Sequence, residues 1–209
     1  MLKPNKPRRS RCERCLRAMS YCLCAYIPAL ANATSVLILQ HPDEAKHPLN
    51  TAGLAALGLK NADLWIGEYF PQLDVRIQSV EQALLLFPAE NPGACTPLLA
   101  RPEVVSSLLV VPDGTWRKAR KIVRMNPALS ALPRLSLALG EPSAYRVRKA
   151  PHPGAVSTIE AIARALTILE PHQDFQALLK PFSVLIEQQI DAMGEEVYRR
   201  NYCNSVVAP

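Results

Sequence analysis

The stretch LLVVPDGTWRKARKIVR, residues 108–124, changes character abruptly at Pro112. The apolar and β-branched residues before this proline are typical of a buried strand, which we expect over residues 105–112. An aspartate, a glycine, a threonine and a tryptophan come next, and a strongly basic segment follows, for which we predict a helix over residues 117–126. A buried strand that passes directly into a helix is the building unit of a parallel α/β sheet.

The rest of the chain repeats this alternation of strand and helix. Short apolar runs predict further strands at 35–40, 62–67, 133–139 and in the part of 80–90 that ends at Pro88. Periodicity and capping residues predict helices at 50–59, 157–170 and 175–200, the last bent or broken near Pro181. We therefore predict an α/β fold, a mostly parallel sheet with helices on both faces.

In sheets of this kind the ligand site lies beyond the carboxyl ends of the strands. The residues that follow the apolar runs are therefore the first candidates for a site. They occupy positions 40–44, 87–90, 113–116 and 140–143.

The overall composition favours a nucleic-acid partner. The chain of 209 residues has a formal net charge of +6, and 49% of its residues are hydrophobic, enough for a packed core. No window approaches the ~18 apolar residues of a membrane span. The cationic N-terminus is not followed by the apolar segment of a signal peptide. We expect a cytoplasmic protein that does not enter a membrane.

Four of the six cysteines lie in CERCLRAMSYCLC, with the spacing C-x2-C-x6-C-x-C. Thiolates this close in sequence can surround one tetrahedral Zn²⁺, and four protein ligands leave no open position, so the zinc would be structural. Four unrelated thiols are the alternative. Arg11, Arg14 and Arg17 lie around the cluster, which suits contact with phosphates. The predicted zinc ligands are Cys12, Cys15, Cys22 and Cys24.

These patterns divide the chain into three parts. We expect a basic tail at residues 1–11, a zinc-binding segment with the four cysteines at residues 12–32, and an α/β domain with C-terminal helices at residues 33–209.

The basic helix of the opening stretch has two faces. At about 100° per residue its cations fall within an arc of about 100°, opposite Ala119, Ile122 and Val123. A solvated surface would show the same pattern. The position of this cationic face beside a strand-end carboxylate favours contact with an RNA backbone. The cations are Arg117, Arg120, Lys121 and Arg124.

The residues between strand and helix allow several roles. Asp113 can cap the helix or, if it faces a pocket, act as a general base. Gly114 permits a tight turn or the close approach of a ligand. Trp116 can belong to the core or offer a stacking surface.

The segment QHPDEAKHPLNTAG carries His41, Asp43, Glu44 and His47. Two histidines with two carboxylates raise the possibility of a metal. The two prolines and the irregular spacing argue against it, and hydrogen bonds to a ligand or within the loop fit better.

Farther along, SAYRVRKAPHPGAVSTIEAIARAL combines a basic loop with a helix start. Ser157 and Glu160 form a capping box, and the exposed N–H groups of that helix N-terminus can bind a carboxylate or phosphate. An extended loop would place Arg146 and Arg148 on one side. The loop predicts RNA contacts, with a mobile surface loop as the alternative. These contacts would come from Tyr145, Arg146, Arg148 and Lys149.

Together, the cysteine pattern, HPDEAKHPLNTAG, LFPAE, DGTW, SAYRVRKA and STIEAIA occur in this order. The ordered set resembles the DTW-domain family, named for its Asp-x-Thr-Trp motif, here residues 113–116. The resemblance extends from Cys12 to about Leu169.

The resemblance implies an activity and a fold. Bacterial members look like tRNA-uridine aminocarboxypropyltransferases, related to the aminocarboxypropyl transferase of small-subunit ribosomal RNA. They move the 3-amino-3-carboxypropyl group of S-adenosylmethionine to N3 of a tRNA uridine and release methylthioadenosine. Their fold is similar to the SPOUT class, whose C-terminal part forms a trefoil knot around the cofactor. The knot rests on the resemblance alone, because knots are rare and periodicity does not reveal them.

The resemblance also implies roles for residues of this chain. The motif supplies the catalytic candidates Asp113, Thr115 and Trp116. Ser157 and Thr158 would meet the amino-acid end of S-adenosylmethionine. SPOUT-like pockets grip adenosine largely through backbone atoms, here expected at Leu86, Phe87, Pro88, Val111, Pro112 and from Leu135 to Leu139.

Two other functions stay open at this point. A SPOUT-like RNA methyltransferase would share fold, cofactor and substrate class and differ only in the carbon transferred. A non-enzymatic, zinc-anchored RNA-binding module would use DGTW as a helix cap. The spacing of a helix-turn-helix or DNA-binding finger is absent from the sequence. We expect the protein to be a monomer.

Overall fold

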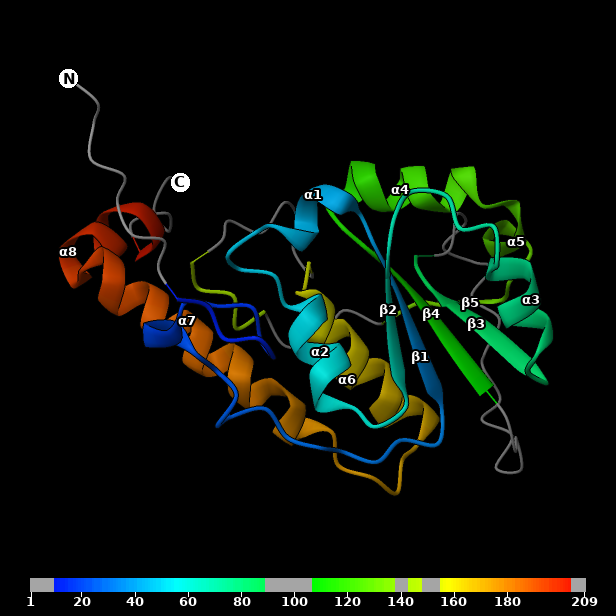
Figure 1. Ribbon diagram of the computed structural model, residues 1–209, viewed down its shortest axis with the longest axis horizontal. Coiled ribbons are helices and arrows are strands. Elements are labelled where there is room, and N and C mark those ends of the chain that lie inside the picture. The colour runs from blue at the N-terminus through cyan, green and yellow to red at the C-terminus, as the bar shows by residue number, and fades with distance from the viewer. Residues whose placement is uncertain (1–9, 89–106, 138–142, 148–154, 204–209) are drawn as a thin grey trace, which may run out of the picture.

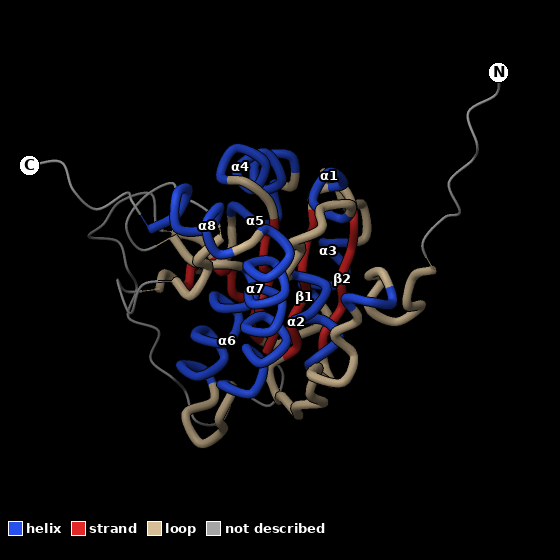
Figure 2. The backbone as a smooth tube through the Cα atoms, turned by 90° about the vertical axis from the view of Figure 1, so that its left-hand side faces the viewer, coloured by secondary structure: helices blue, strands red, loops and turns tan. Residues whose placement is uncertain are grey.

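The computed structural model describes residues 10–88, 107–137, 143–147 and 155–203. In this part of the chain, five parallel strands form one sheet in the order β2-β1-β4-β3-β5. Helices lie on both sides of the sheet (Figures 1 and 2). The predicted α/β architecture is therefore confirmed. The strands are β1 (Ser35–Gln40), β2 (Ala62–Ile66), β3 (Gln82–Leu86), β4 (Ser107–Asp113) and β5 (Arg134–Leu135).

The helices divide between the two faces. On one side α2 (Ala52–Gly58), α6 (Thr158–Leu169) and α7 (Lys180–Met193) cover the sheet; on the other lie α3 (Leu73–Gln78), α4 (Trp116–Met125) and α5 (Pro127–Ser130). Short helical turns complete the set: α1 (Pro42–Ala45), α8 (Glu195–Tyr198), the 3₁₀ turns Met19–Tyr21 and Gln176–Leu179, and the π turn Arg199–Cys203.

Alternation along the central strands creates two hydrophobic cores. Val36 and Ile38 of β1 pack with α2, α6 and α7, whereas Leu37 and Leu39 pack with α3, α4 and α5. Successive strand residues point to opposite faces, so this division follows from the strand geometry. All six residues of β1 are buried, as expected for a central strand of a parallel sheet.

The structure corrects several predicted boundaries. The strand expected in residues 80–90 is Gln82–Leu86, and of the strand expected at 133–139 the described residues 133–137 contain Arg134–Leu135. The long helical region is divided into a 3₁₀ turn and α7, which begins with Pro181 in its first turn, and it breaks again at Gly194 with φ of 82°. The short helices α1 and α3 were not predicted because they are too short to show a helical period.

The cysteine segment packs on the α2, α6 and α7 side of the sheet. Leu23 and Ile27 are buried in the same hydrophobic core cluster as Leu54, Leu166 and Phe182. This contact fixes the segment against the domain independently of any metal. Among the helices that the structure describes, none has the length and apolar character needed to cross a membrane.

Candidate active site and cysteine centre

Asp113 is the last residue of β4 and lies at the carboxyl edge of the sheet. Its register partner on β1 is Gln40, so both side chains lie at the same level on neighbouring strands. The Gln40 side-chain amide donates from Nε2 to Asp113 Oδ2 at 2.8 Å, and the Thr158 hydroxyl donates to Asp113 Oδ1. Asp113 is only 7% exposed, and a neutral donor reaches each of its two carboxylate oxygens.

Behind Asp113 the hydrogen-bonded group extends to the start of α2. Asn50 Nδ2 donates to Gln40 Oε1 at 3.3 Å, and Gln40 Nε2 also reaches Asn50 Oδ1 at 3.1 Å. The same Asn50 oxygen accepts from the backbone N–H of Gly53 at 3.3 Å, which makes Asn50 a side-chain cap of α2. We define Asp113, Gln40, Thr158 and Asn50 as the Asp113 cluster. It joins the ends of β1 and β4 to the N-termini of α2 and α6.

The alternative that Asp113 caps the following helix is not what the structure shows. The N-cap residue of α4 is Thr115, and Asp113 is still part of β4. Gly114 makes the tight turn between them. A residue with a Cβ would not fit here, because that atom would lie 2.9 Å from Lys118 Cβ and 3.5 Å from His41 Cβ. The tight turn expected at this glycine is therefore confirmed, and the atoms closest to it belong to the protein itself.

The N-terminus of α6 has the predicted capping box. Ser157 Oγ accepts from the Glu160 backbone N–H at 3.5 Å, and the Glu160 carboxylate accepts from the Ser157 backbone N–H at 2.8 Å. Glu160 also accepts from the Ser143 hydroxyl at 2.7 Å and from the Ala144 backbone N–H at 2.8 Å. This buried carboxylate therefore fastens residues 143–147 to the start of α6, a role that the capping pattern did not predict.

The residues expected around adenosine fall into two groups. The side chains of Leu86, Val111 and Leu135 are buried in the core. These residues could therefore contact a ligand only through their backbone atoms. Phe87 is half-buried, and Pro88 is exposed beyond the end of β3. Pro112 is half-buried within β4, and Leu139 lies outside the described residues.

Trp116 packs against an aromatic residue that follows β3. It is half-buried, and its ring contacts Phe87 edge-on with centroids 5.7 Å apart. The Arg134 guanidinium lies 5.8 Å from the Phe87 ring centroid. The DGTW motif and the end of β3 therefore meet through an aromatic contact.

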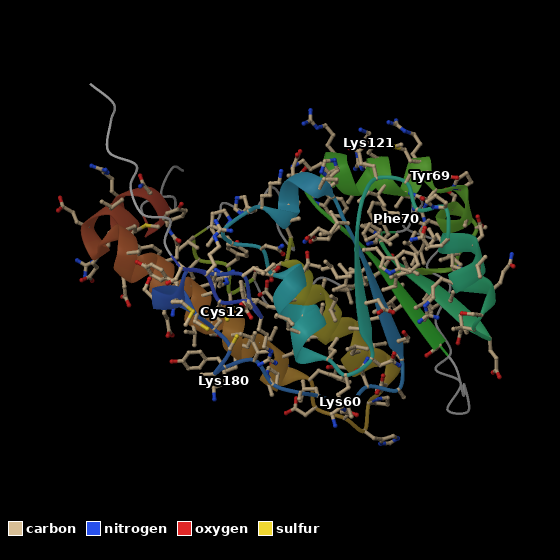
Figure 3. All side chains as sticks on the ribbon, in the orientation of Figure 1. Cys12, Lys60, Tyr69, Phe70, Lys121 and Lys180 are labelled. Carbon is tan, nitrogen blue, oxygen red and sulfur yellow. The ribbon has the colours of Figure 1, made fainter. Side chains whose placement is uncertain are left out.

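The predicted two-faced character of α4 is confirmed, with one change to its cationic side. Ala119, Ile122 and Val123 are buried, whereas the three arginines are exposed and make no ion pair with any residue that the structure describes. Lys121 is different, because its Nζ lies 2.6 Å from Glu68 Oε2. Figure 3 shows Lys121 on the side of the molecule away from Lys60 and Lys180. Within the described part of the chain, the cations of α4 without an ion pair are Arg117, Arg120 and Arg124.

His41 belongs to a second polar group at the same sheet edge. Its Nδ1 accepts from the Asp43 backbone N–H at 3.2 Å, so Nε2 carries the proton and donates to Glu68 Oε1 at 2.7 Å. This confirms that the histidine bonds within the protein and caps α1. His47 Nδ1 likewise accepts from the Leu49 backbone N–H at 3.2 Å.

Ion pairs complete this second group. Lys118 Nζ lies 2.9 Å from Glu44 Oε1 and 3.3 Å from Asp43 Oδ2, which joins α1 to α4. Lys118 lowers the pKa of Asp43, Lys121 lowers the pKa of Glu68, and Glu44 raises the pKa of Lys118. We define the His41 cluster as the following residues: His41, Asp43, Glu44, Glu68, Lys118 and Lys121.

The basic loop before α6 contains a core residue. Tyr145 is 8% exposed, its ring lies 5.3 Å from that of Phe182, and its hydroxyl donates to the Leu49 carbonyl at 3.1 Å. This burial argues against the RNA contact expected of Tyr145. Val147 is also buried and Arg146 is exposed, which is the predicted alternation. Arg148 and Lys149 lie outside the described residues.

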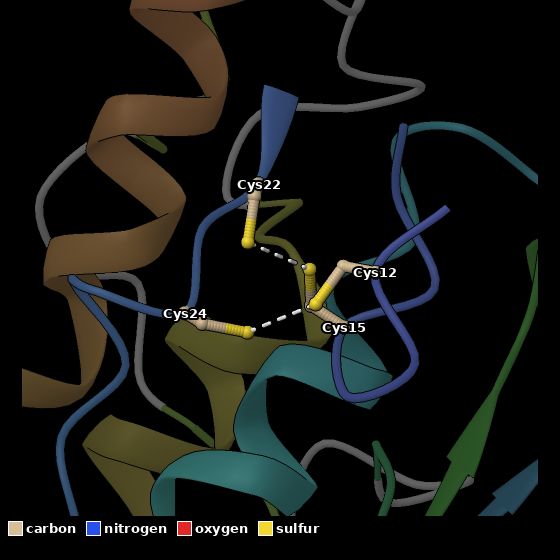
Figure 4. Close-up of side chains that lie close together, drawn as sticks. All are labelled: Cys12, Cys15, Cys22 and Cys24. Carbon is tan, nitrogen blue, oxygen red and sulfur yellow. Dashed lines mark hydrogen bonds between the residues drawn. The ribbon is translucent and has the colours of Figure 1, made fainter. Parts of the chain in front are cut away.

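The four cysteines converge in space as their spacing predicts (Figure 4). Their sulfur atoms all lie within 4.8 Å of one another, with Cys12 and Cys24 3.5 Å apart and Cys15 and Cys22 3.8 Å apart. A tetrahedral site with Zn–S bonds of about 2.3 Å requires S···S separations of roughly 3.8 Å. The donor set therefore fits one tetrahedral thiophilic metal.

The turn that holds the first two cysteines has a defined backbone. Leu16 adopts a φ of 58°, which bends the chain so that the Cys12 N–H donates to the Arg17 carbonyl at 2.7 Å. Hydrogen bonds from the backbone N–H groups of Cys15 and Arg14 lower the pKa of Cys12 to about 6. Burial, followed by neighbouring thiols, raises the pKa of Cys24 to about 12. A bound cation would hold all four as thiolates.

The three arginines near the cysteines do not share one environment. Arg11 and Arg14 are exposed, as phosphate contacts would require. Arg17 is half-buried and donates to the Asn50 carbonyl at 3.3 Å, and burial lowers its pKa. The sequence did not reveal this contact because it joins residues from two separate segments.

Comparison with known proteins gives a consistent result. The family model described as DTW domain matches residues 9–190. The chain is 36% identical over 198 residues to tRNA-uridine aminocarboxypropyltransferase 2 of Drosophila melanogaster, a match covering 88% of this chain and 76% of the relative. It is 32% identical over 192 residues to the protein of the same name from Mus musculus, covering 88% and 64% of the two chains.

A plant relative extends the same pattern. The chain is 26% identical over 205 residues to tRNA-uridine aminocarboxypropyltransferase A of Arabidopsis thaliana, and the match covers 78% of this chain and 74% of the relative. No solved structure matches the chain.

Proposed function

The chain belongs to the DTW domain family, and on this premise we propose that it transfers the 3-amino-3-carboxypropyl group of S-adenosylmethionine to N3 of a uridine in tRNA. The names of its relatives support the substrate and the group transferred. The observation that carries the proposal is the buried Asp113 carboxylate, held at the carboxyl edge of a parallel sheet by hydrogen bonds from the neutral side chains of Gln40 and Thr158.

Asp113 is proposed as the general base. Uridine N3–H is a weak acid, and the nitrogen becomes a nucleophile when the carboxylate takes its proton. The hydrogen bonds from Gln40 and Thr158 orient this carboxylate at the edge of the sheet. N3 then forms a bond to the γ-carbon as the C–S bond breaks. The bonding pair returns to the sulfonium sulfur, and neutral methylthioadenosine leaves.

The hydrogen bond between Thr158 and Asp113 supports the expected orientation of the donor. Thr158 and Ser157 were predicted to hold the amino-acid end, and Thr158 lies directly beside the proposed base. An amino-acid chain bound at the start of α6 would therefore bring its γ-carbon close to Asp113. Which carbon faces the nucleophile decides which group moves, because proximity governs the transfer. The adenosine would contact the backbone at Leu86–Pro88, Val111–Pro112 and Leu135–Leu139.

The exposed arginines of α4 are the proposed contacts for the tRNA backbone, with Arg146, Arg148 and Lys149 of the basic loop. The α4 arginines begin directly after the DGTW motif, so a phosphate chain bound along them would pass the edge that holds Asp113. Thr115 and Trp116 would shape this entrance. The positive charge of the arginines would account for a salt-dependent affinity.

We propose that the four cysteines bind a structural Zn²⁺. Their sulfur separations and the absence of a fifth protein donor in the described group support this assignment. The protein purified without chelator should contain one zinc per chain, measured by elemental analysis. Cys24→Ser should lose the metal, and a wild-type protein free of zinc but fully active would overturn the proposal.

The finer fold and the divisions of the chain are part of the same proposal. The parallel sheet supports a SPOUT-like domain over residues 33–209, whose knot would involve residues near the cofactor, with a basic tail at 1–11 and the metal segment at 12–32. A tRNA substrate supports a location in the cytoplasm, and a monomer remains the expectation for the oligomeric state.

One assay tests the activity directly. The protein is incubated with bulk tRNA and S-adenosylmethionine, and the tRNA is digested to nucleosides for mass spectrometry. A uridine that gains the aminocarboxypropyl mass supports the proposal. A methyl gain instead would identify a methyltransferase, and a lack of S-adenosylmethionine binding would leave an RNA-binding module.

A further inference from the structure

A continuous path of hydrogen bonds leads from the cysteine segment to Asp113. Arg17 lies in the loop between Cys15 and Cys22, and its carbonyl accepts from the Cys12 N–H at 2.7 Å. The backbone of Arg17 is therefore fixed by the same turn that presents the sulfur atoms. Its guanidinium leaves this turn and donates to the Asn50 carbonyl at 3.3 Å.

The second part of the path sets the orientation of a buried amide. Asn50 Nδ2 donates to Gln40 Oε1 at 3.3 Å, which directs Gln40 Nε2 toward Asp113 Oδ2 at 2.8 Å. Gln40 is 1% exposed, so water does not readily replace Asn50 as its partner. If Asn50 moved, the Gln40 amide could rotate and turn its oxygen toward the carboxylate, where two acceptors repel.

We infer that Arg17 and Gln40 are positioning residues for the transfer reaction, through which the cysteine segment sets the place of the Asp113 carboxylate. This inference rests on the proposed function, in which Asp113 accepts the uridine proton. It assigns the cysteine segment a role inside the catalytic domain in addition to any contact with RNA.

Loss of the Arg17 side chain should affect the reaction without unfolding the protein, because other contacts hold the two segments that Arg17 joins. The loop before α2 is also held by Tyr145, whose hydroxyl donates to the Leu49 carbonyl at 3.1 Å. The cysteine segment is itself anchored by Leu23 and Ile27 in the core. Removing the Arg17 guanidinium should therefore leave the loop before α2 and the cysteine segment in place. It should allow only a small shift of Asn50, and through Gln40 of the Asp113 carboxylate. Displacements of about 1 Å in a catalytic group can cost up to about 10²-fold in rate.

A double-mutant cycle in the full-length, zinc-loaded protein tests the inference. Gln40→Met keeps the size of the side chain but cannot donate to Asp113, and kcat should fall by about 10–100-fold, the range for a hydrogen bond to a charged group. Arg17→Ala should lower kcat by about tenfold, within the cost of a misplaced catalytic group. In both variants KM for S-adenosylmethionine and for tRNA should change less than about twofold, because neither residue is placed against a substrate.

The double variant decides whether the two residues act through one path. If they do, Arg17→Ala should add little to Gln40→Met, whereas independent effects would multiply. Arg17→Lys, which retains a donor, should recover most of the activity. Glu13→Ala, an exposed position of the same turn, is the control and should match wild type. Multiplying effects, or a wild-type kcat in zinc-loaded Arg17→Ala, would overturn the inference.

Two measurements separate this inference from the proposed function. Zinc content should remain one per chain in Arg17→Ala. The side-chain NH₂ signals of Gln40 in the nitrogen–proton NMR spectrum, assigned by their loss in Gln40→Met, should shift in Arg17→Ala and not in Glu13→Ala. An inactive wild type with these shifts would refute the proposed function and keep the structural path. An active wild type without the shifts would refute the path alone.

Discussion

Adjacent residues at the end of β1 belong to two different polar clusters, and the contrast between them explains where chemistry is possible. Gln40 contributes to the Asp113 cluster, in which a buried carboxylate meets an amide and a hydroxyl. His41 contributes to the His41 cluster, in which more exposed carboxylates meet Lys118 and Lys121. Both clusters lie at the carboxyl edge of the same sheet, and they differ in the burial of their carboxylates and in the side chains that join them.

This difference determines what each carboxylate can do. A lysine beside a carboxylate holds the pKa of Glu68 and of Asp43 below its usual range, which makes these groups weaker proton acceptors. A threonine hydroxyl can donate to an ionised carboxylate or accept from a protonated one by rotating. The Thr158 hydroxyl can therefore keep its hydrogen bond to Asp113 in either protonation state of the carboxyl group, whereas the ion pairs of the His41 cluster suit a fixed connection between α1 and α4.

The largest expected effect comes from replacing the carboxylate of the Asp113 cluster. Asp113→Asn keeps the size of the side chain but cannot accept the uridine proton, so transfer at neutral pH should fall by about 10²–10⁴-fold. Binding of S-adenosylmethionine and tRNA should change far less. Single-turnover rates and separate binding measurements distinguish the two.

A pH series sharpens this first test. Raising the pH should partly restore Asp113→Asn, since hydroxide can then ionise the uridine without the base. Near-normal turnover of a folded Asp113→Asn at neutral pH would show that the contrast between the clusters has no catalytic meaning.

The next largest effect should come from the exposed arginines of α4. Replacing Arg117, Arg120 and Arg124 with alanine should weaken tRNA binding by at least about tenfold and reduce its salt slope by about 2–3, because fewer counterions are released. S-adenosylmethionine affinity should be unchanged. The triple variant is compared with wild type by tRNA titration at several salt concentrations.

Two control variants test whether the effect on tRNA binding depends on the position of the cations. Lys60→Ala with Lys180→Ala removes cations from another side of the molecule and should leave tRNA affinity near wild type (Figure 3). Lys121→Ala should cost less than any one arginine, because Glu68 already neutralises Lys121. If the controls and the triple variant behave alike, only the overall charge matters.

A smaller effect should follow from the hydroxyl of the Asp113 cluster. Thr158→Val removes the donor to Asp113 Oδ1 with little change of shape, and kcat should fall by about tenfold, the lower range for a hydrogen bond to a charged group. Thr158→Ser retains a hydroxyl and should recover most of the loss. Equal rates for the valine and serine variants would mean that this hydroxyl does not contribute.

The smallest effect is expected in the His41 cluster. Glu68→Gln should lower Tm by no more than about 4 °C at pH 7, because exposed ion pairs contribute little, and transfer should be nearly unchanged. The pKa of Glu68 is lower in the folded protein, so its stabilisation is present above the ordinary glutamate pKa of about 4.3 and is lost as pH falls through the folded value. The difference in Tm between variant and wild type should therefore shrink below about pH 4. A constant difference would contradict the ion-pair explanation.

Local patterns were sufficient for much of the fold. The apolar run of β1, the capping box of α6 and the two faces of α4 were all predicted, because each depends on residues within a few turns of the chain. The cysteine spacing likewise predicted a converging set of sulfur atoms. The family resemblance supplied the reaction, which no periodicity encodes.

Long-range contacts decided the rest. Tyr145 looked like an RNA contact among cations, yet the ring is buried against Phe182 of α7. Lys121 looked like part of a free cationic stripe, yet Glu68, just beyond the end of β2, pairs with it. In both cases the local sequence suggested a role in a basic surface. A partner from another element of the fold determines where the side chain lies and what it contacts.

Asp113 shows the same division most clearly. The sequence by itself placed an aspartate at the end of a buried strand, because an apolar β-branched run and the glycine after it are local signals. Only the tertiary structure supplied its donors, since Gln40 and Thr158 lie 73 and 45 residues away in the chain. The parallel pairing of β1 with β4 and the packing of α6 on the sheet bring them together. Sheet order and helix packing depend on the burial of the whole apolar surface, and no short segment contains that information.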